Sequence, residues 1–147
     1  MAALKTYDPK LFDIVFAGIS LSEGLADGTF LTIAPDSAGF TKKVGVDGEV
    51  TRSRMHDRTA TVTFTCMQTS EVNDRLSALY NADRDAVNGS GVGTFFVQDR
   101  AGNTIGEASK AYISDDPDLV LSGEAETREW TLELADWRPF HGGTPDE

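Results

Sequence analysis

The chain has 147 residues and a formal charge of −11, from 24 acidic and 13 basic side chains. This length suits one domain (1–147) with a core of its own, and the acidic excess argues against an outer surface that grips nucleic-acid phosphates. A single cysteine excludes an intrachain disulfide. No apolar run reaches the length of a membrane span, and the N-terminus lacks the apolar core of a signal peptide. We therefore expect a protein of the cytoplasm or of an assembly built there.

The first residues predict an arm followed by a strand. Residues 1–10 are polar and contain Pro9, so we expect an N-terminal arm. Residues 11–19 alternate with period two, which predicts a strand with one buried face. The apolar residues on that face are Phe12, Ile14 and Phe16.

A second predicted strand, residues 29–34, ends at Pro35 and leads into a long connector, residues 35–58. A connector of this length is unusual in a compact domain and is typically functional or disordered. From Phe40 to Arg58 it holds five basic and three acidic residues, so this part is +2 and the rest of the chain is −13. We predict a structureless basic arm that docks against other copies of the chain.

Residues 59–68 show the clearest alternation of polar and apolar residues in the chain, which predicts a strand with one solvent-exposed face. Threonines lie on one face and apolar residues on the other: Thr59, Thr61, Thr63 and Thr65 against Ala60, Val62, Phe64 and Cys66. Residues 70–86 change to helical spacing, with Thr69 or Ser70 as the N-cap. We expect this helix to lie across the open end or one face of a sheet.

The C-terminal part predicts more strands. Residues 93–99 and 104–114 form a hairpin, in which Gly106 and Ala108 indicate a bulge or a close backbone approach. Residues 119–123 are short and ambiguous between strand and loop. The last strand is expected over residues 128–137, and residues 139–147 form a C-terminal tail. We predict a mainly β fold of about six to eight antiparallel strands, a β-sandwich or partial barrel with one α-helix.

The side chains that could carry chemistry favour ordinary roles. His56 and His141 are isolated, whereas zinc needs three or four ligands, and Cys66 lies on an apolar strand face. The acidic run Asp115–Asp118 lacks the spacing of a calcium loop, and residues 88–93 lack the end of a phosphate-binding loop. We therefore expect no catalytic site, metal or cofactor.

Two polar strand faces remain, and two interpretations of them are open. They are either solvated sheet faces or the lining of a water-filled channel in an assembly. The residues concerned are Thr59, Thr61, Thr63, Thr65, Glu129, Thr131 and Glu133.

Several stretches, in order and spacing, resemble the tail tube proteins of contractile-tailed bacteriophages. They are Ala26–Phe30, Phe40–Lys42, Val46–Arg54, Gln68–Ser70, Asn73–Leu79 and Arg128–Trp130. The resemblance extends over most of the chain, from Tyr7 to Phe140.

The resemblance implies a fold shared with the type VI secretion tube and subunits that form stacked hexameric rings. It implies an inner β-barrel joined from neighbouring sheets, and an electronegative bore through which genomic DNA passes without specific binding. The implied partners are sheath, tape measure, baseplate and terminator proteins, in a virion assembled in the host cytoplasm. Expected inter-subunit contacts are Phe40, Lys42, Lys43, Val44, Arg52 and Arg54.

Two other functions stay open at this point. A type VI-like tube or a baseplate component would share the subunit fold but differ in partners. A monomeric β-sandwich enzyme or carbohydrate-binding module would use the carboxylates of residues 115–118 and 124–133 in a concave pocket. The tube interpretation predicts an arm that is disordered alone and ordered on assembly.

Overall fold

The computed structural model describes residues 2–89 and 91–146. Met1, Ser90 and Glu147 lie outside the described residues; they belong to the predicted N-terminal arm, the 88–93 connector and the C-terminal tail. The described chain is mainly β, as predicted, but it has ten strands rather than six to eight.

In chain order the elements are η1 (Pro9–Leu11), β1 (Phe12–Phe16), β2 (Ile19–Ser20), β3 (Leu31–Pro35), β4 (Phe40–Val44), β5 (Val50–Arg54), β6 (Ala60–Met67), α1 (Val72–Asp85), β7 (Gly93–Asp99), β8 (Ile105–Asp115), β9 (Thr127–Leu134) and β10 (Trp137–Phe140).

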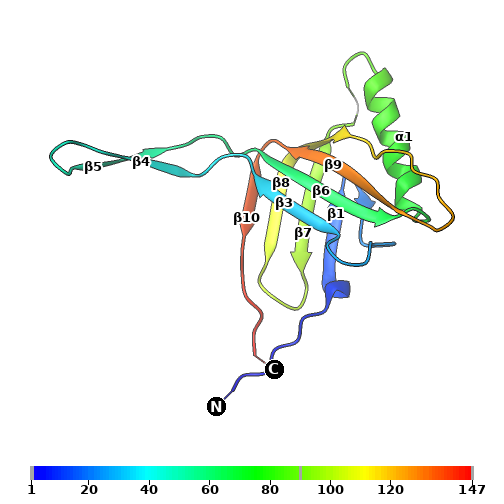
Figure 1. Ribbon diagram of the computed structural model, residues 1–147, viewed down its shortest axis with the longest axis horizontal. Coiled ribbons are helices and arrows are strands. Elements are labelled where there is room, and N and C mark those ends of the chain that lie inside the picture. The colour runs from blue at the N-terminus through cyan, green and yellow to red at the C-terminus, as the bar shows by residue number, and fades with distance from the viewer. Residues whose placement is uncertain (1, 90, 147) are drawn as a thin grey trace.

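Eight strands form one antiparallel sheet that folds back on itself. Its order is β2-β1-β7-β8-β9-β6-β3, with β10 paired to β8 off this path. The corner is β8, whose first half pairs with β10 and whose second half pairs with β9. Strands β3, β6 and β9 consequently cross over the layer that contains β1, β7, β8 and β10 (Figure 1). This confirms the predicted sandwich or partial barrel.

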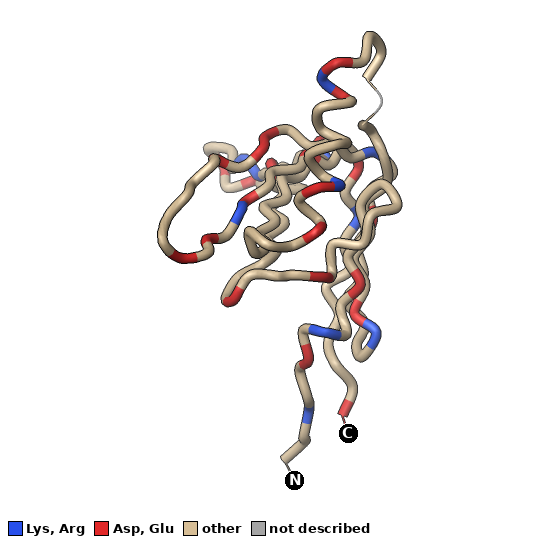
Figure 2. The backbone as a smooth tube through the Cα atoms, turned by 90° about the vertical axis from the view of Figure 1, so that its right-hand side faces the viewer, with Lys and Arg blue, Asp and Glu red and all other residues tan. Residues whose placement is uncertain are grey.

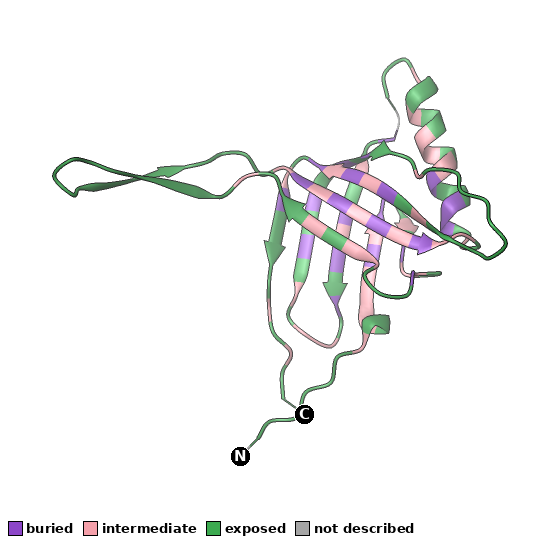
Figure 3. Cartoon of the chain, viewed as in Figure 1, coloured by how far each residue is buried: buried purple, intermediate pink, exposed green. Residues whose placement is uncertain are grey.

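The core lies between these two layers and under the first turns of α1. Alternation decides which side chains fill it: every second residue of β6 is buried, from Ala60 to Cys66, and the buried bands of neighbouring strands coincide (Figure 3). The largest fully buried side chains include Trp130, Phe16 and Phe64. Each large apolar side chain buried in this way contributes about 1.5–3 kcal/mol before entropy is counted.

Helix α1 follows β6 and is attached to the body through its N-terminal half, where Val72 and Leu76 are buried. The predicted cap differs slightly. The N-cap residue is Glu71, which makes no side-chain cap hydrogen bond, while the Val72 amide donates to Ser70 Oγ at 3.3 Å. Ser70 therefore satisfies a helix-end amide from one position further out.

Two predicted strands differ from the structure, and the segment that was ambiguous between strand and loop is a loop. The strand expected over residues 11–19 is two strands, because Ala17 (φ 51°) and Gly18 (φ 80°) turn the chain between β1 and β2. The strand expected over residues 128–137 breaks at residues 135–136 into β9 and β10, so the expected tail begins inside β10. Residues 119–123 form no strand.

The prediction of a structureless connector over residues 35–58 is wrong. Strand β3 continues through Pro35, and β4 and β5 form a two-stranded hairpin that projects from the body along the long axis of the molecule (Figure 1). Its turn is closed by the Gly45 amide donating to Glu49 O at 2.7 Å, and Gly48 adopts φ +89°. A left-handed conformation of this kind favours glycine. The pair Asp47-Gly48 between two alternating segments is typical of a hairpin turn, and the sequence could have predicted the hairpin from it.

Candidate assembly surfaces

The hairpin β4–β5 has two different faces, because directly opposed residues of a β-ribbon point to the same side. The paired positions are Phe40 with Arg54, Lys42 with Arg52, and Val44 with Val50. We call this set of six residues the apolar–cationic face. The opposite face carries Thr41, Lys43, Thr51 and Ser53.

The structure thus brings together five of the six expected contact residues on one face and separates Lys43 from them. It adds Val50, which the sequence interpretation missed. All ten strand residues of the hairpin are exposed, as the uniformly green hairpin in Figure 3 shows. Arg52 Cζ lies 4.3 Å from the centre of the Phe40 ring, a distance at which a cation and a ring attract each other.

The basic side chains of the hairpin form no ion pair with residues 2–89 and 91–146. Among the described residues, the ion pairs are Lys5 with Asp146, Arg100 with Asp13, and Arg138 with Asp136. None involves the hairpin. Its charges and its apolar side chains therefore remain available to another molecule.

The segments that join the hairpin to the body contain Ser37 on one side and Asp57 and Thr59 on the other, and we call them the neck. One carboxylate connects the two sides. Asp57 accepts hydrogen bonds from the Thr59 hydroxyl (2.6 Å), the Thr59 amide (3.0 Å) and the Ser37 hydroxyl (2.7 Å). These bonds, those from Thr59 first, hold the pKa of Asp57 below its ordinary value. Thr59 therefore belongs to the neck, just before β6, although the alternation grouped it with the threonines of that strand.

Beside the neck lies a hollow of about 430 Å³. Phe40 and Met55 supply apolar walls. The charged and polar walls are Arg54, Arg58, His56 and Asp57, whose carboxylate is engaged by Ser37 and Thr59. This neck hollow continues from the apolar–cationic face, because Phe40 and Arg54 belong to both. It has the size to receive a side chain from a neighbouring molecule.

The second predicted surface, the polar sheet face, is continuous across β6 and β9. Thr61 lies opposite Glu133, Thr63 opposite Thr131, and Thr65 opposite Glu129. The Thr61 hydroxyl lies 3.2 Å from Glu133 Oε2 and 2.9 Å from Asp36 Oδ1. The face therefore combines hydroxyls with carboxylates and turns away from the core.

The sequence interpretation missed a buried polar centre at Asn73, which is only 3% exposed. Its Oδ1 accepts from Trp130 Nε1 (3.0 Å) and from Cys66 Sγ (3.2 Å). Its Nδ2 lies within hydrogen-bond distance of three backbone carbonyls, those of Met67, Gln68 and Ser70. Burial raises the pKa of the Cys66 thiol, so this side chain is a neutral donor in the core.

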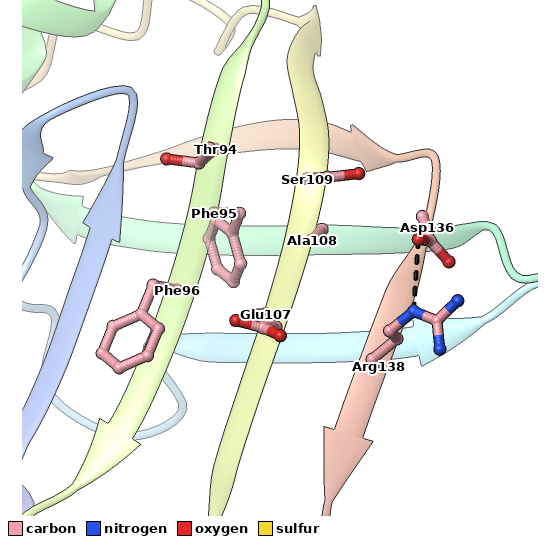
Figure 4. A pocket seen from close by; sticks show the side chains of 8 residues that line it. All are labelled: Thr94, Phe95, Phe96, Glu107, Ala108, Ser109, Asp136 and Arg138. Carbon is pink, nitrogen blue, oxygen red and sulfur yellow. Dashed lines mark hydrogen bonds and ion pairs between the residues drawn. The ribbon is translucent and has the colours of Figure 1, made fainter.

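The remaining polar groups line separate hollows. A hollow of about 430 Å³ over β7 and β8 (Figure 4) contains Glu107 and the Arg138–Asp136 pair, at 3.2 Å, but neither histidine. Within residues 2–89 and 91–146, no group of three or more His, Cys, Asp or Glu side chains could hold a metal ion. Nor does this part of the chain contain a helix long and apolar enough to cross a membrane.

Comparison with solved structures shows the same fold in contractile injection systems. A tube-terminating cap of the anti-feeding prophage matches with a TM-score of 0.62 at 11% identity, over 99% of this chain and 95% of the other. The PVC sheath/tube terminator matches at 0.58 and 12%, over 95% and 100%. A chain of the PVC sheath-tube complex matches at 0.52 and 12%, over 88% and 87%.

Comparison of sequences extends the likeness from fold to family. "Structural protein ORF10" of Pseudomonas phage KPP10 is 30% identical over 143 residues, which cover 94% of this chain and 83% of that protein. The profile of the bacteriophage PhiTE tail tube protein family matches residues 16–139, a stretch that contains every strand from β2 to β9 and the hairpin. The chain belongs to this family of phage tail tube proteins.

Proposed function

We propose that the chain is the repeating subunit of a tail tube, that its copies form hexameric rings, and that stacked rings form the conduit for DNA ejection. The observation that carries this proposal is the projecting hairpin, whose apolar side chains are exposed and whose basic side chains form no ion pair among the described residues. Leaving such a ribbon exposed is unfavourable for a monomer. A neighbouring subunit would cover it.

The open edges of the sheet support ring formation. Strands β2 and β3 end the sheet and pair on one side only. Edge strands of this kind invite pairing with another chain. In a ring, the sheets of neighbouring subunits would join edge to edge and close into a barrel.

The polar face of β6 and β9 is the proposed lining of the bore. It presents threonine hydroxyls with the carboxylates of Glu129, Glu133 and Asp36, and it includes no lysine or arginine among the paired positions from Thr61 to Thr65. DNA binding depends on basic contacts to phosphates. A carboxylate-lined wall would therefore let DNA pass without holding it.

The proposed partners are further copies of the chain, a surrounding sheath, a tape measure protein, and baseplate and terminator proteins. The proposed location is the virion tail, assembled in the host cytoplasm. The family match favours the repeated tube subunit over a terminal cap, although caps share the fold. It likewise favours a phage tube without catalytic activity over the enzyme interpretation.

Negative-stain electron microscopy of the purified protein over a concentration series tests this function. The proposal predicts hollow rings at low concentration and tubes of constant diameter at high concentration. Monomers at every concentration, also under macromolecular crowding, would contradict a self-assembling subunit. Filaments without a central bore would contradict the conduit.

A further inference from the structure

A second exposed apolar segment lies at the opposite end of the molecule from the hairpin. The connector between β8 and β9, residues 116–126, contains the consecutive residues Leu119, Val120 and Leu121, of which both leucines are about three-quarters exposed (74% and 75%). In Figure 1 it lies on the right, yellow to orange, whereas the hairpin projects to the left. Three consecutive large apolar side chains in solvent require an explanation.

Carboxylates flank this apolar run on both sides. The connector contains Asp116, Asp118, Glu124 and Glu126 and no lysine or arginine. Figure 2 looks onto this end of the molecule and shows red acidic positions along its exposed loops. Arg128 lines the same small hollow as Asp116 and Asp118, about 140 Å³ in volume, yet the ion pairs of the described residues include none of these side chains.

The connector and the apolar–cationic face of the hairpin are complementary in two respects. Each consists of exposed apolar residues interspersed with charges, and the charges are of opposite sign and unpaired within the described chain. The neck hollow of about 430 Å³ could receive a leucine side chain between Phe40 and Met55, with Arg54 and Arg58 beside it. Like-charged surfaces would repel, whereas these would attract and align.

We infer that the apolar–cationic face and neck hollow of one subunit bind the 116–126 connector of a second copy of the same chain. The two surfaces lie at opposite ends of one molecule, so the hairpin of a chain cannot reach the connector of the same chain. Such a head-to-tail contact leaves a free hairpin at one end and a free connector at the other, and it therefore repeats. The inference rests on the proposed function and identifies the surface that the hairpin meets.

Reciprocal charge reversal tests this contact. The hairpin variant carries Arg52→Glu with Arg54→Glu, and the connector variant carries Asp116→Lys with Asp118→Lys. Each variant alone replaces two attractive charges at the contact with two repulsive ones, so its assembly concentration should rise at least about tenfold over wild type. Tube yield is measured by pelleting and electron microscopy, and smaller oligomers by sedimentation equilibrium.

Mixing the two variants gives the decisive result. The acidic hairpin of one variant would meet the basic connector of the other, and the wild-type hairpin and connector would also meet. An equimolar mixture should therefore assemble within about threefold of the wild-type concentration, as should a chain that carries all four substitutions. A general effect of net charge would not be rescued in this way.

The controls separate the contact from overall charge. Asp27→Lys with Asp85→Lys makes the same charge change as the connector variant, at exposed positions outside the connector and the hairpin, and should assemble like wild type. The inference is overturned if the connector variant assembles normally, or if the hairpin variant does not rescue its assembly. Either result would leave the proposed tube function unaffected. Charge-dependent association of soluble wild-type oligomers without tubes would support the contact and contradict the proposed tube. Monomeric wild-type protein at all concentrations would overturn both.

Discussion

One buried polar residue, Asn73, helps to fix the position of α1 against the sheet. Asn73 connects the helix to Cys66 on β6 and Trp130 on β9. It also donates to backbone carbonyls at the end of β6 and in the segment between β6 and α1. A buried amide with both ends bonded specifies one packing arrangement. The sequence gives no local signal for this role, because Asn73 occupies an ordinary helix position and its partners come from distant strands.

We expect Asn73→Ala to destabilise the fold by about 2–4 kcal/mol, because it leaves the buried Trp130 N–H without an acceptor. Urea denaturation followed by tryptophan fluorescence measures the free energy of unfolding. Asn81→Ala, at an exposed position of the same helix, is the matched control and should change this free energy by less than about 0.5 kcal/mol. Equal effects of the two substitutions would contradict the role assigned to Asn73.

Gly106 provides a second test at the residue scale. A Cβ at this position would clash with the ring of Trp137 on β10, which identifies the close approach that the sequence indicated. Gly106→Ala should cost about 1–3 kcal/mol by forcing the ring away. Gly123→Ala, where an added Cβ meets nothing within 4 Å, should be nearly neutral in thermal denaturation. Unchanged stability of the Gly106 variant would show that the strand and ring adjust freely.

At the scale of elements, alternation predicted most strands, and glycine-containing turns explain most errors. The strand β6 and the β7–β8 hairpin lie where period two and turn residues placed them. The break between β1 and β2 depends on Ala17 in a left-handed conformation, which sequence patterns do not favour for alanine. The β4–β5 hairpin was missed because both of its faces are exposed, so apolar and charged residues are mixed on one face and no buried face marks the strands.

Neighbouring lysines on opposite hairpin faces give a matched pair of variants. Lys42→Glu reverses a charge on the apolar–cationic face and should raise the assembly concentration several-fold, since opposed like charges weaken association. Lys43→Glu makes the same change on the other face and should have little effect. Light scattering during assembly measures both. Equal effects would mean that general electrostatics, rather than one docking face, controls association.

The neck of the hairpin should respond to acid. The folded-state pKa of Asp57 is lowered, so its hydrogen bonds contribute stability above the unfolded-state pKa, and this contribution is lost as pH falls through the folded-state pKa. NMR amide shifts of Thr59 and Met55 should change together in this acidic range. In Asp57→Asn, which has no carboxyl to titrate, the coupled change should be absent; its persistence would assign the acid response to another group.

At the scale of the whole molecule, an acidic body carries a projecting hairpin with exposed basic and apolar side chains. Composition revealed the charge contrast, and the resemblance of ordered motifs revealed the family. Neither could show that five of six expected contacts share one face, or that the 116–126 connector lies at the other end. Those facts depend on strand register and on the path of the folded chain.

Cryo-electron microscopy of the assembled tube would show how the subunits are arranged. We predict stacked hexameric rings in which Glu129, Thr131 and Glu133 face the bore and Phe40, Lys42 and Arg52 are buried against another subunit. Hairpins that project free into solvent, or a bore lined by a different face of the sheet, would contradict the proposed subunit arrangement.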